Sequence, residues 1–239
     1  MDQKKLTLQP RLKKLADLIP QGSVVADIGT DHGYLPVWLL QEGRISHAIA
    51  SDINKKPLDH ARQTACEYGI AGQIEFRLCA GLNGYAPGEV DIIVIAGMGG
   101  ETISSILEAA PWTKRGDIRL LLQPMTKTEF LRVWLVDKGY SFIDEHLVFD
   151  KDFLYPILCV TGGEPRTLTE AEAYGGILLE RDPLWGRYLG QQMKRLRVRI
   201  DGLLSSGKDT AREETNRLNE LYAALAARKE KLHEHGTGN

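Results

Sequence analysis

The stretch that decides the fold is VADIGTDHGYL, residues 25–35. It predicts a buried strand that runs directly into a turn between Gly29 and Gly33. A dinucleotide-binding turn reads Gly-x-Gly-x-x-Gly, so that a pyrophosphate can lie against bare backbone. Here the two glycines enclose Thr-Asp-His instead, and the Asp31 carboxylate would repel a pyrophosphate. The turn therefore suits a ligand that carries positive charge near the backbone.

Short apolar runs alternate with helical patterns on both sides of this stretch, as far as about Gly163. Strands are expected at residues 23–29, 47–53, 74–79, 91–97 and 117–124, and helices at 35–42, 56–68, 102–109 and 128–138. Strands that are apolar on both faces and alternate with helices indicate a parallel sheet covered on both sides. Residues 142–149 and 154–162 add an antiparallel hairpin. The sequence thus predicts an α/β fold with a Rossmann-like class I methyltransferase sheet.

The pattern from Leu184 onward is helical only. Apolar residues recur at coiled-coil spacing in two segments, at Leu189, Met193, Leu196, Ile200 and Leu203 and again at Leu218, Leu221, Leu225 and Leu232. A capping box at Thr210 and Glu213 begins the second segment, so the pair predicts an antiparallel helical hairpin. We therefore expect a cofactor-binding methyltransferase domain at residues 1–163 and a helical coiled-coil domain at residues 164–239.

Composition excludes several classes of protein. The 239 residues carry a net charge of −2, which argues against a binder that works by overall charge. No apolar run approaches the roughly 20 residues of a membrane span, and the first residues lack the apolar core of a signal peptide. The three cysteines form no CxxC pair, and the histidines lack metal-ligand spacing. We expect a cytoplasmic protein with reduced thiols, no membrane partner and no metal site.

The end of the second expected strand carries another acid, Asp52, about twenty residues after the glycine turn. At this place an acid accepts hydrogen bonds from a ribose diol, although Asp52 is also suited to cap the next helix. Asp31 and Asp52 together favour an adenosine cofactor. The charge of Asp31 favours S-adenosylmethionine over a nicotinamide, because its ammonium and sulfonium are cationic.

The fourth expected strand is followed by AGMGG, residues 96–100. Class I methyltransferases place the methyl acceptor at this point, and glycines there let a flat substrate approach the backbone. A tight turn with Met98 in the core is the alternative interpretation. The Asn-Pro-Pro-aromatic motif that serves exocyclic amines is missing from this position, which argues against an exocyclic amine as the target.

These motifs together carry a family resemblance. VADIGTDHGYLP, ASDIN, IAGMGGETI and LLLQPMTKTEFLRVWLVDKGY followed by DEHLVFDKDFLYPILCV resemble the bacterial tRNA adenine-N1 methyltransferase family called TrmK. The resemblance runs from about Arg11 to Gly163, and the helical hairpin behind it fits the family's layout. It implies S-adenosylmethionine as cofactor, tRNA as partner, and methyl transfer to N1 of adenine 22. One departure is Ala80, where the family has Asp or Asn, so backbone groups around Gly81 are the expected substitute at the cofactor adenine.

The predicted site residues follow from these motifs and the resemblance. Cofactor binding is assigned to Asp27, Gly29, Asp31, His32, Asp52, Ile53, Gly81, Leu82, Ala96, Gly97 and Met98. Asp31 and Gln123 are the catalytic candidates, and the carbonyls of Ala96 and Gly97 are the expected acceptors for the N6 amino group. Tyr34 and Met98 are expected to wall the acceptor, although His32 and Tyr34 also suit simple packing of the first helix.

Basic residues gather in two places despite the slightly negative total. RNA contacts are assigned to Arg11, Lys13, Lys14, Arg187, Lys194, Arg195, Arg197 and Arg199. Residues 184–200 hold five of these without a single acid, which favours phosphate contacts over the alternative of charged faces beside a coiled-coil seam.

Two other functions stay open from the residues alone. A small-molecule methyltransferase would share the cofactor motifs but would have no use for the basic helix. A non-catalytic Rossmann-like module would dock a partner through its coiled coil. The sequence does not fix an oligomeric state.

Overall fold

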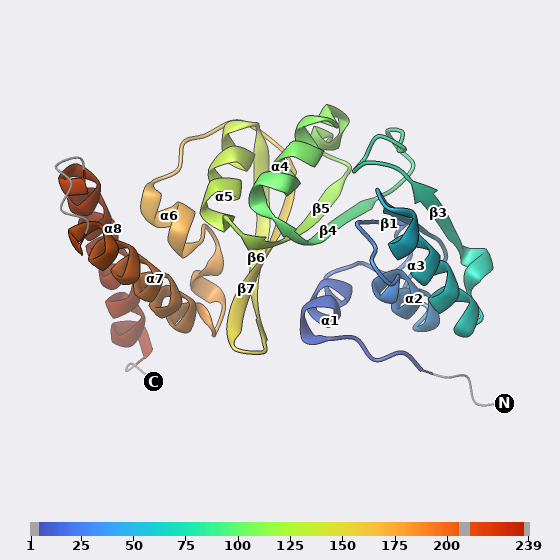
Figure 1. The fold of residues 1–239 in the computed structure, drawn as a ribbon, viewed down its shortest axis with the longest axis horizontal. Coiled ribbons are helices and arrows are strands. Elements are labelled where there is room, and N and C mark those ends of the chain that lie inside the picture. Colours follow the sequence, from blue (N-terminus) through green and yellow to red (C-terminus); the bar gives the residue numbers. More distant parts are fainter. Residues whose placement is uncertain (1–4, 206–210, 237–239) are drawn as a thin grey trace. The chain divides into compact units, whose positions relative to one another are not determined.

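The computed structural model describes residues 5–205 and 211–236 (Figure 1). The chain forms two compact units, divided between Thr167 and Leu168. The boundary predicted from the sequence, between residues 163 and 164, lies four residues before this division. None of the described helices is both long enough and apolar enough to cross a membrane.

The first unit is built on one seven-stranded sheet with the order β3-β2-β1-β4-β5-β7-β6. Its strands are β1 (Val25–Ile28), β2 (Ala48–Asp52), β3 (Ile74–Leu78), β4 (Ile92–Gly99), β5 (Arg119–Thr126), β6 (Tyr140–Asp150) and β7 (Phe153–Gly162). Strands β1 to β5 run parallel, and β7 inserts antiparallel between β5 and β6. The predicted class I methyltransferase sheet with its closing hairpin is confirmed.

Helices cover both faces of this sheet, as the two-sided apolar strands predicted (Figure 1). They are α1 (Pro10–Asp17), α2 (Tyr34–Gln41), α3 (Lys55–Glu67), α4 (Gly100–Glu108) and α5 (Thr128–Asp137), with short 3-10 turns η1 (Ala71–Gln73) and η2 (Pro111–Lys114). Alternate residues of each strand point to opposite cores. In β4, Ile92 and Val94 pack with α1, α2 and α3, whereas Ile93 and Ile95 pack with α4 and α5.

Strand β4 continues further than the apolar run predicted. It reaches Gly99, because its pairing with β5 persists through two register shifts around Met98. Gly97 adopts φ +77° within this irregular stretch, a conformation that glycine reaches without steric cost. Residues 96–99 of AGMGG are therefore the end of strand β4 and not a free loop, and Gly100 begins α4.

A fully buried ion pair joins α5 to β6. Arg132 Nε donates to Glu145 Oε1 at 2.7 Å, and neither side chain is exposed to solvent. Burial of two charges is expensive unless each compensates the other, so the pair ties the helix to the antiparallel hairpin.

The second unit is helical. It contains α6 (Glu170–Gly175), η3 (Leu179–Arg181), α7 (Trp185–Ser205) and α8 (Ala211–Gly236). Helices α7 and α8 form the predicted hairpin, with Leu196 and Ile200 of α7 and Leu218 and Leu225 of α8 all buried. The predicted cap at Thr210 lies outside the described residues. The sequence analysis missed α6, which begins with a complete capping box between Thr169 and Glu172.

Candidate active site

The carboxyl ends of β1, β2 and β4 meet at the glycine turn, where open α/β sheets bind ligands. Gly29 lies at this point with φ +76°. A Cβ atom on Gly29 would lie 2.2 Å from Met98 Cε, so the Met98 side chain occupies the space that the missing Cβ leaves. The turn and the AGMGG segment are therefore packed directly against each other.

Two cavities flank Gly29, with volumes of about 320 Å³ and 570 Å³. The smaller is lined by Gly29, Asp52, Ile53, Gly81, Leu82 and Met98 of the predicted cofactor residues. The larger is lined by Asp27, Gly29, Asp31, His32, Ala96 and Gly97. Every predicted cofactor residue thus lines one of two adjoining cavities.

The smaller cavity combines Asp52 with mostly apolar walls. Asp52 Oδ1 accepts a hydrogen bond from the Asn54 backbone N–H at 2.7 Å, and Asn54 itself occupies the N-cap of α3. Asp52 therefore supports the turn before the helix with one oxygen, and Oδ2 makes no hydrogen bond to a described residue. That oxygen is available to a ribose hydroxyl.

Helix α4 forms another wall of the same cavity. This wall was not predicted from the sequence. Thr102, Ser105, Ile106 and Ala109 all line it, from the helix and its C-cap. The spacing of three, one and three residues puts them on one face of the helix. That spacing was visible in the sequence, but the face is too polar to stand out as a core stripe.

The larger cavity holds two carboxyl groups in different surroundings. Burial raises the pKa of Asp27 to about 6, the neighbouring Asp52 adds to the increase, and the Thr30 hydroxyl opposes it. The Asp31 side chain is 74% exposed, and its Oδ2 lies 3.4 Å from His32 Nε2. A cationic ligand group next to Asp27 would favour its ionised form, and the two opposite charges would attract each other.

Three rings are stacked beside this cavity. The centroid of His32 lies 5.2 Å from that of Tyr34 and 5.1 Å from that of His60, with planes within 12° and 5° of parallel. Ligand atoms of Asp31, His32 and His60 lie within 4.8 Å of one another. Parallel imidazoles direct their in-plane lone pairs side by side and not toward one point, so the arrangement is a ring stack. Tyr34 is 38% exposed and lines the cavity.

Gln123 and Arg11 form a buried support beneath the AGMGG segment. The Gln123 carbonyl oxygen accepts hydrogen bonds from the Gly97 N–H at 3.2 Å and from Arg11 Nη1 at 3.1 Å. Arg11 Nε donates to Asp150 Oδ2 at 2.6 Å. Gln123 is fully buried, and the hydrogen bond to its Oε1 from the Gly97 N–H joins it to the AGMGG segment. In this structure the guanidinium of Arg11, which was predicted to contact RNA, donates hydrogen bonds to Asp150 and Gln123.

Comparison with known proteins agrees with this geometry. A family model described as "Methyltransferase domain" matches residues 8–158. The tRNA (adenine(22)-N(1))-methyltransferase of Bacillus subtilis (strain 168) is 37% identical over 187 residues, which are 78% of this chain and 76% of the relative. The crystal structure of the B. subtilis M1A22 tRNA methyltransferase TrmK superposes with a TM-score of 0.84 at 29% identity, covering 94% of this chain and 100% of that one. The chain belongs to the TrmK family.

A further TrmK structure extends the likeness. M. capricolum TrmK, solved with the natural cofactor product S-adenosyl-homocysteine, has a TM-score of 0.77 at 26% identity and covers 93% of this chain and 98% of that one. Coverage above nine tenths of the chain includes most of the second unit, so the helical hairpin is part of the TrmK layout.

The departure from the TrmK pattern at Ala80 has a neighbouring polar group. Ala80 lines the smaller cavity, and so does Asn83, which the sequence analysis did not single out. Asn83 brings an amide to the wall from which the family's usual Asp or Asn is missing.

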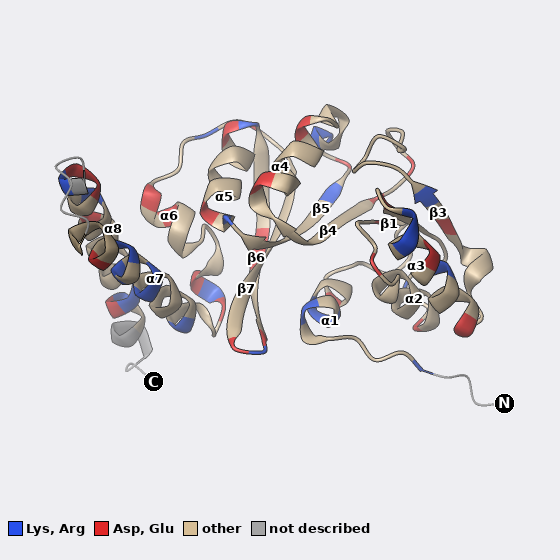
Figure 2. Ribbon diagram, in the orientation of Figure 1, with Lys and Arg blue, Asp and Glu red and all other residues tan. Residues whose placement is uncertain are grey.

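In this TrmK member, the predicted RNA-binding residues of the second unit lie along α7 and are exposed (Figure 2). They are Arg187, Lys194, Arg195, Arg197 and Arg199. Arg199 pairs with Glu214, and the Arg197 guanidinium lies 4.9 Å from the Tyr222 ring centroid. Lys194 and Arg195 make no ion pair with a described residue. In the first unit, Lys13 pairs with Asp17, and Lys14 is half-buried.

Proposed function

We propose that the chain transfers the methyl group of S-adenosylmethionine to N1 of adenine 22 in tRNA. The observation that carries the proposal is the pair of cavities around Gly29, with Asp52 in one and Asp27 and Asp31 in the other. This arrangement suits an adenosine on one side of the glycine and a cationic methionine end on the other. The name of the B. subtilis relative supplies the acceptor base and its position.

The residues around Gly29 fit this cofactor in shape and charge. The Gly29 position gives no room for a side chain, and Met98, which fills it, is flexible. Asp52 is assigned to the ribose hydroxyls, and Ile53, Leu82 and Ile106 to the faces of the adenine. The buried Asp27 is assigned to the ammonium of the methionine end. The bound cofactor supplies an electrophilic methyl group on a sulfonium.

The acceptor needs alignment more than it needs a base. Adenine N1 is an unprotonated in-plane nucleophile at neutral pH, so the enzyme gains most from orienting it toward the methyl group. Attack leaves positive charge on N1 and the N6 amino group, which nearby acceptors stabilise. The Ala96 and Gly97 carbonyls and the Asp31 carboxylate are the assigned acceptors, and Gln123 positions Gly97.

The substrate has to present an unpaired adenine. N1 lies on the Watson–Crick edge, so the base must leave its pair before it reacts. The exposed basic residues of α7 are assigned to the phosphates of the tRNA, and such contacts fix register without reading sequence. Residues 1–167 would then catalyse methyl transfer, and residues 168–239 would bind the tRNA.

The test is transfer of a tritiated methyl group to unmodified tRNA, followed by nucleoside analysis. We expect 1-methyladenosine as the sole labelled nucleoside, and none from a tRNA with guanine at position 22. Label on an exocyclic amine would contradict the assigned acceptor. Equal transfer to free adenosine would favour the small-molecule methyltransferase instead.

A further inference from the structure

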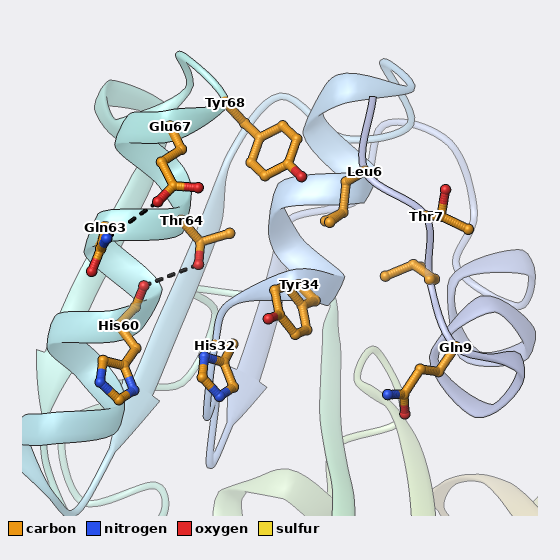
Figure 3. Close-up of a pocket in the computed structure, with 11 residues that line it drawn as sticks. Leu6, Thr7, Gln9, His32, Tyr34, His60, Gln63, Thr64, Glu67 and Tyr68 are labelled. Carbon is orange, nitrogen blue, oxygen red and sulfur yellow. Dashed lines mark hydrogen bonds between the residues drawn. The ribbon is translucent and has the colours of Figure 1, made fainter. Parts of the chain in front are cut away.

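A third cavity, of about 520 Å³, lies beside the active site (Figure 3). The segment of residues 6–9 forms one wall, and helix α3 forms the opposite wall from His60 to Tyr68. Its volume is within the range of roughly 300–1,000 Å³ that is usual for small-molecule sites. Neither the cofactor nor the acceptor assigned above uses this space.

The walls combine flat rings with hydrogen-bonding groups. Tyr34, His32 and His60 contribute the parallel ring stack, and Tyr68 closes the cavity at the far end of α3 (Figure 3). Side chains with amide and hydroxyl groups also line the cavity. On α3, Gln63 Nε2 donates to Glu67 at 3.2 Å, and the Thr64 hydroxyl donates to the His60 carbonyl at 3.0 Å. Flat aromatic faces beside donors and acceptors are what proteins use to hold an unpaired nucleobase.

The cavity also adjoins the catalytic one. Gln9, His32 and Tyr34 line both this cavity and the one that contains Asp27 and Asp31. A chain of nucleotides that places one base against Gly97 therefore has a second base-sized space next to it, across the Tyr34 ring.

We propose that this third cavity binds an unpaired base of the RNA strand, adjacent to the adenine that is methylated. The proposal rests on the proposed function, because it takes the strand to enter through the catalytic cavity. Stacking on the Tyr34–His32–His60 rings supplies the affinity, and the polar groups of α3 bind the base edge. Holding the neighbouring base outside the helix also keeps the target adenine unpaired.

The first test is the double variant His60→Ala and Gln63→Ala in the full chain, with unmodified tRNA as the ligand. We expect tRNA binding to weaken roughly tenfold, with unchanged affinity for S-adenosylmethionine and unchanged rate at saturating tRNA. Cys66→Ala is the matched control, since Cys66 is an exposed residue of the same helix that does not line the cavity. Wild-type tRNA affinity in the double variant overturns the proposal.

A second test uses the wild-type chain, so that it does not depend on how the variant folds. A tRNA with a photoreactive thio-base on either side of adenine 22 is cross-linked, and the modified peptides are identified. We expect cross-links to Tyr34 or to residues 60–68. If the wild-type chain methylates the tRNA but the cross-links are confined to other peptides, the proposed base site is wrong. Absence of methyl transfer to tRNA by the wild-type chain would instead contradict the proposed function.

Discussion

The two units of the chain hold their charged and polar groups in opposite ways. The first unit buries several of them, including Asp27, Gln123 and the Arg132–Glu145 pair. The α7–α8 pair buries an apolar seam and displays its basic residues to solvent. Buried groups need defined partners, so the first unit is built for one ligand geometry. Exposed charges accept many geometries, which suits an extended polyanion.

The largest expected difference is in stability. Glu145→Ala leaves the Arg132 charge buried, and we expect it to lower the free energy of unfolding of the first unit by about 3–5 kcal/mol. Glu214→Ala, which removes the surface ion pairs with Arg199 and Arg217, is expected to cost less than about 1 kcal/mol. Urea denaturation, with hydrogen exchange to separate the two units, measures both. Similar losses for the two variants would remove the contrast between the units.

The second prediction concerns RNA affinity. We expect Arg195→Glu with Arg197→Glu to weaken tRNA binding by about a hundredfold at low salt and to reduce the salt slope by about two. Cofactor affinity should not change. The control reverses Arg115 and Lys138, which lie before β5 and after α5, at the amino edge of the sheet. An equal effect of the control pair would mean that overall charge, and not α7, binds the RNA.

The third prediction tests the smaller cavity. Asp52→Ala is expected to weaken binding of S-adenosylmethionine by about 1–3 kcal/mol, because ribose hydroxyls lose their acceptor in a partly enclosed site. Asp59→Ala is the control, since Asp59 is an exposed acid on the adjoining helix. Calorimetry measures both affinities. An unchanged affinity would leave Asp52 with its hydrogen bond to Asn54 as its sole role.

The fourth prediction tests the chemical step. Asp31→Asn should keep the fold, since the side chain is largely exposed, but should lower the single-turnover methylation rate at least tenfold. The physical reason is the loss of a negative charge near the developing positive charge on the base. A wild-type single-turnover rate would exclude Asp31 from that role.

The fifth prediction is a pH dependence of cofactor binding. Because burial raises the pKa of Asp27 to about 6, its carboxyl becomes protonated below that pH and loses its attraction for an ammonium. We expect affinity for S-adenosylmethionine to fall about tenfold between about pH 7.5 and pH 5, and Asp27→Asn to abolish the change. Without cofactor, the stability of the fold depends on pH in the opposite direction. The raised pKa stabilises the fold on the acid side, and that stability is lost as the pH rises through about 6.

Local pattern was enough to predict the sheet and which residues lie around the glycine turn. The carboxyl ends of parallel strands converge at one edge, so strand endings alone placed Asp52 and Gly97 in two cavities that adjoin at Gly29. Partners far apart in the chain could not be predicted in this way. Arg11 bonds to Asp150 and Gln123 across more than a hundred residues, and no periodicity in the sequence reports such a contact.

Met98 over Gly29 has a chemical consequence of its own. Its terminal group is a sulfur that carries a methyl, which is the uncharged counterpart of the group that the cofactor brings. A cofactor that spans Gly29, as in the proposed function, would bring its own methylated sulfur to the space that this thioether occupies, and the methionine side chain is flexible enough to move aside. The Gly29 backbone would then exchange its contacts with Met98 for contacts with the cofactor. Under the proposed function, loading and release of the cofactor would then need the movement of one unbranched side chain above the turn.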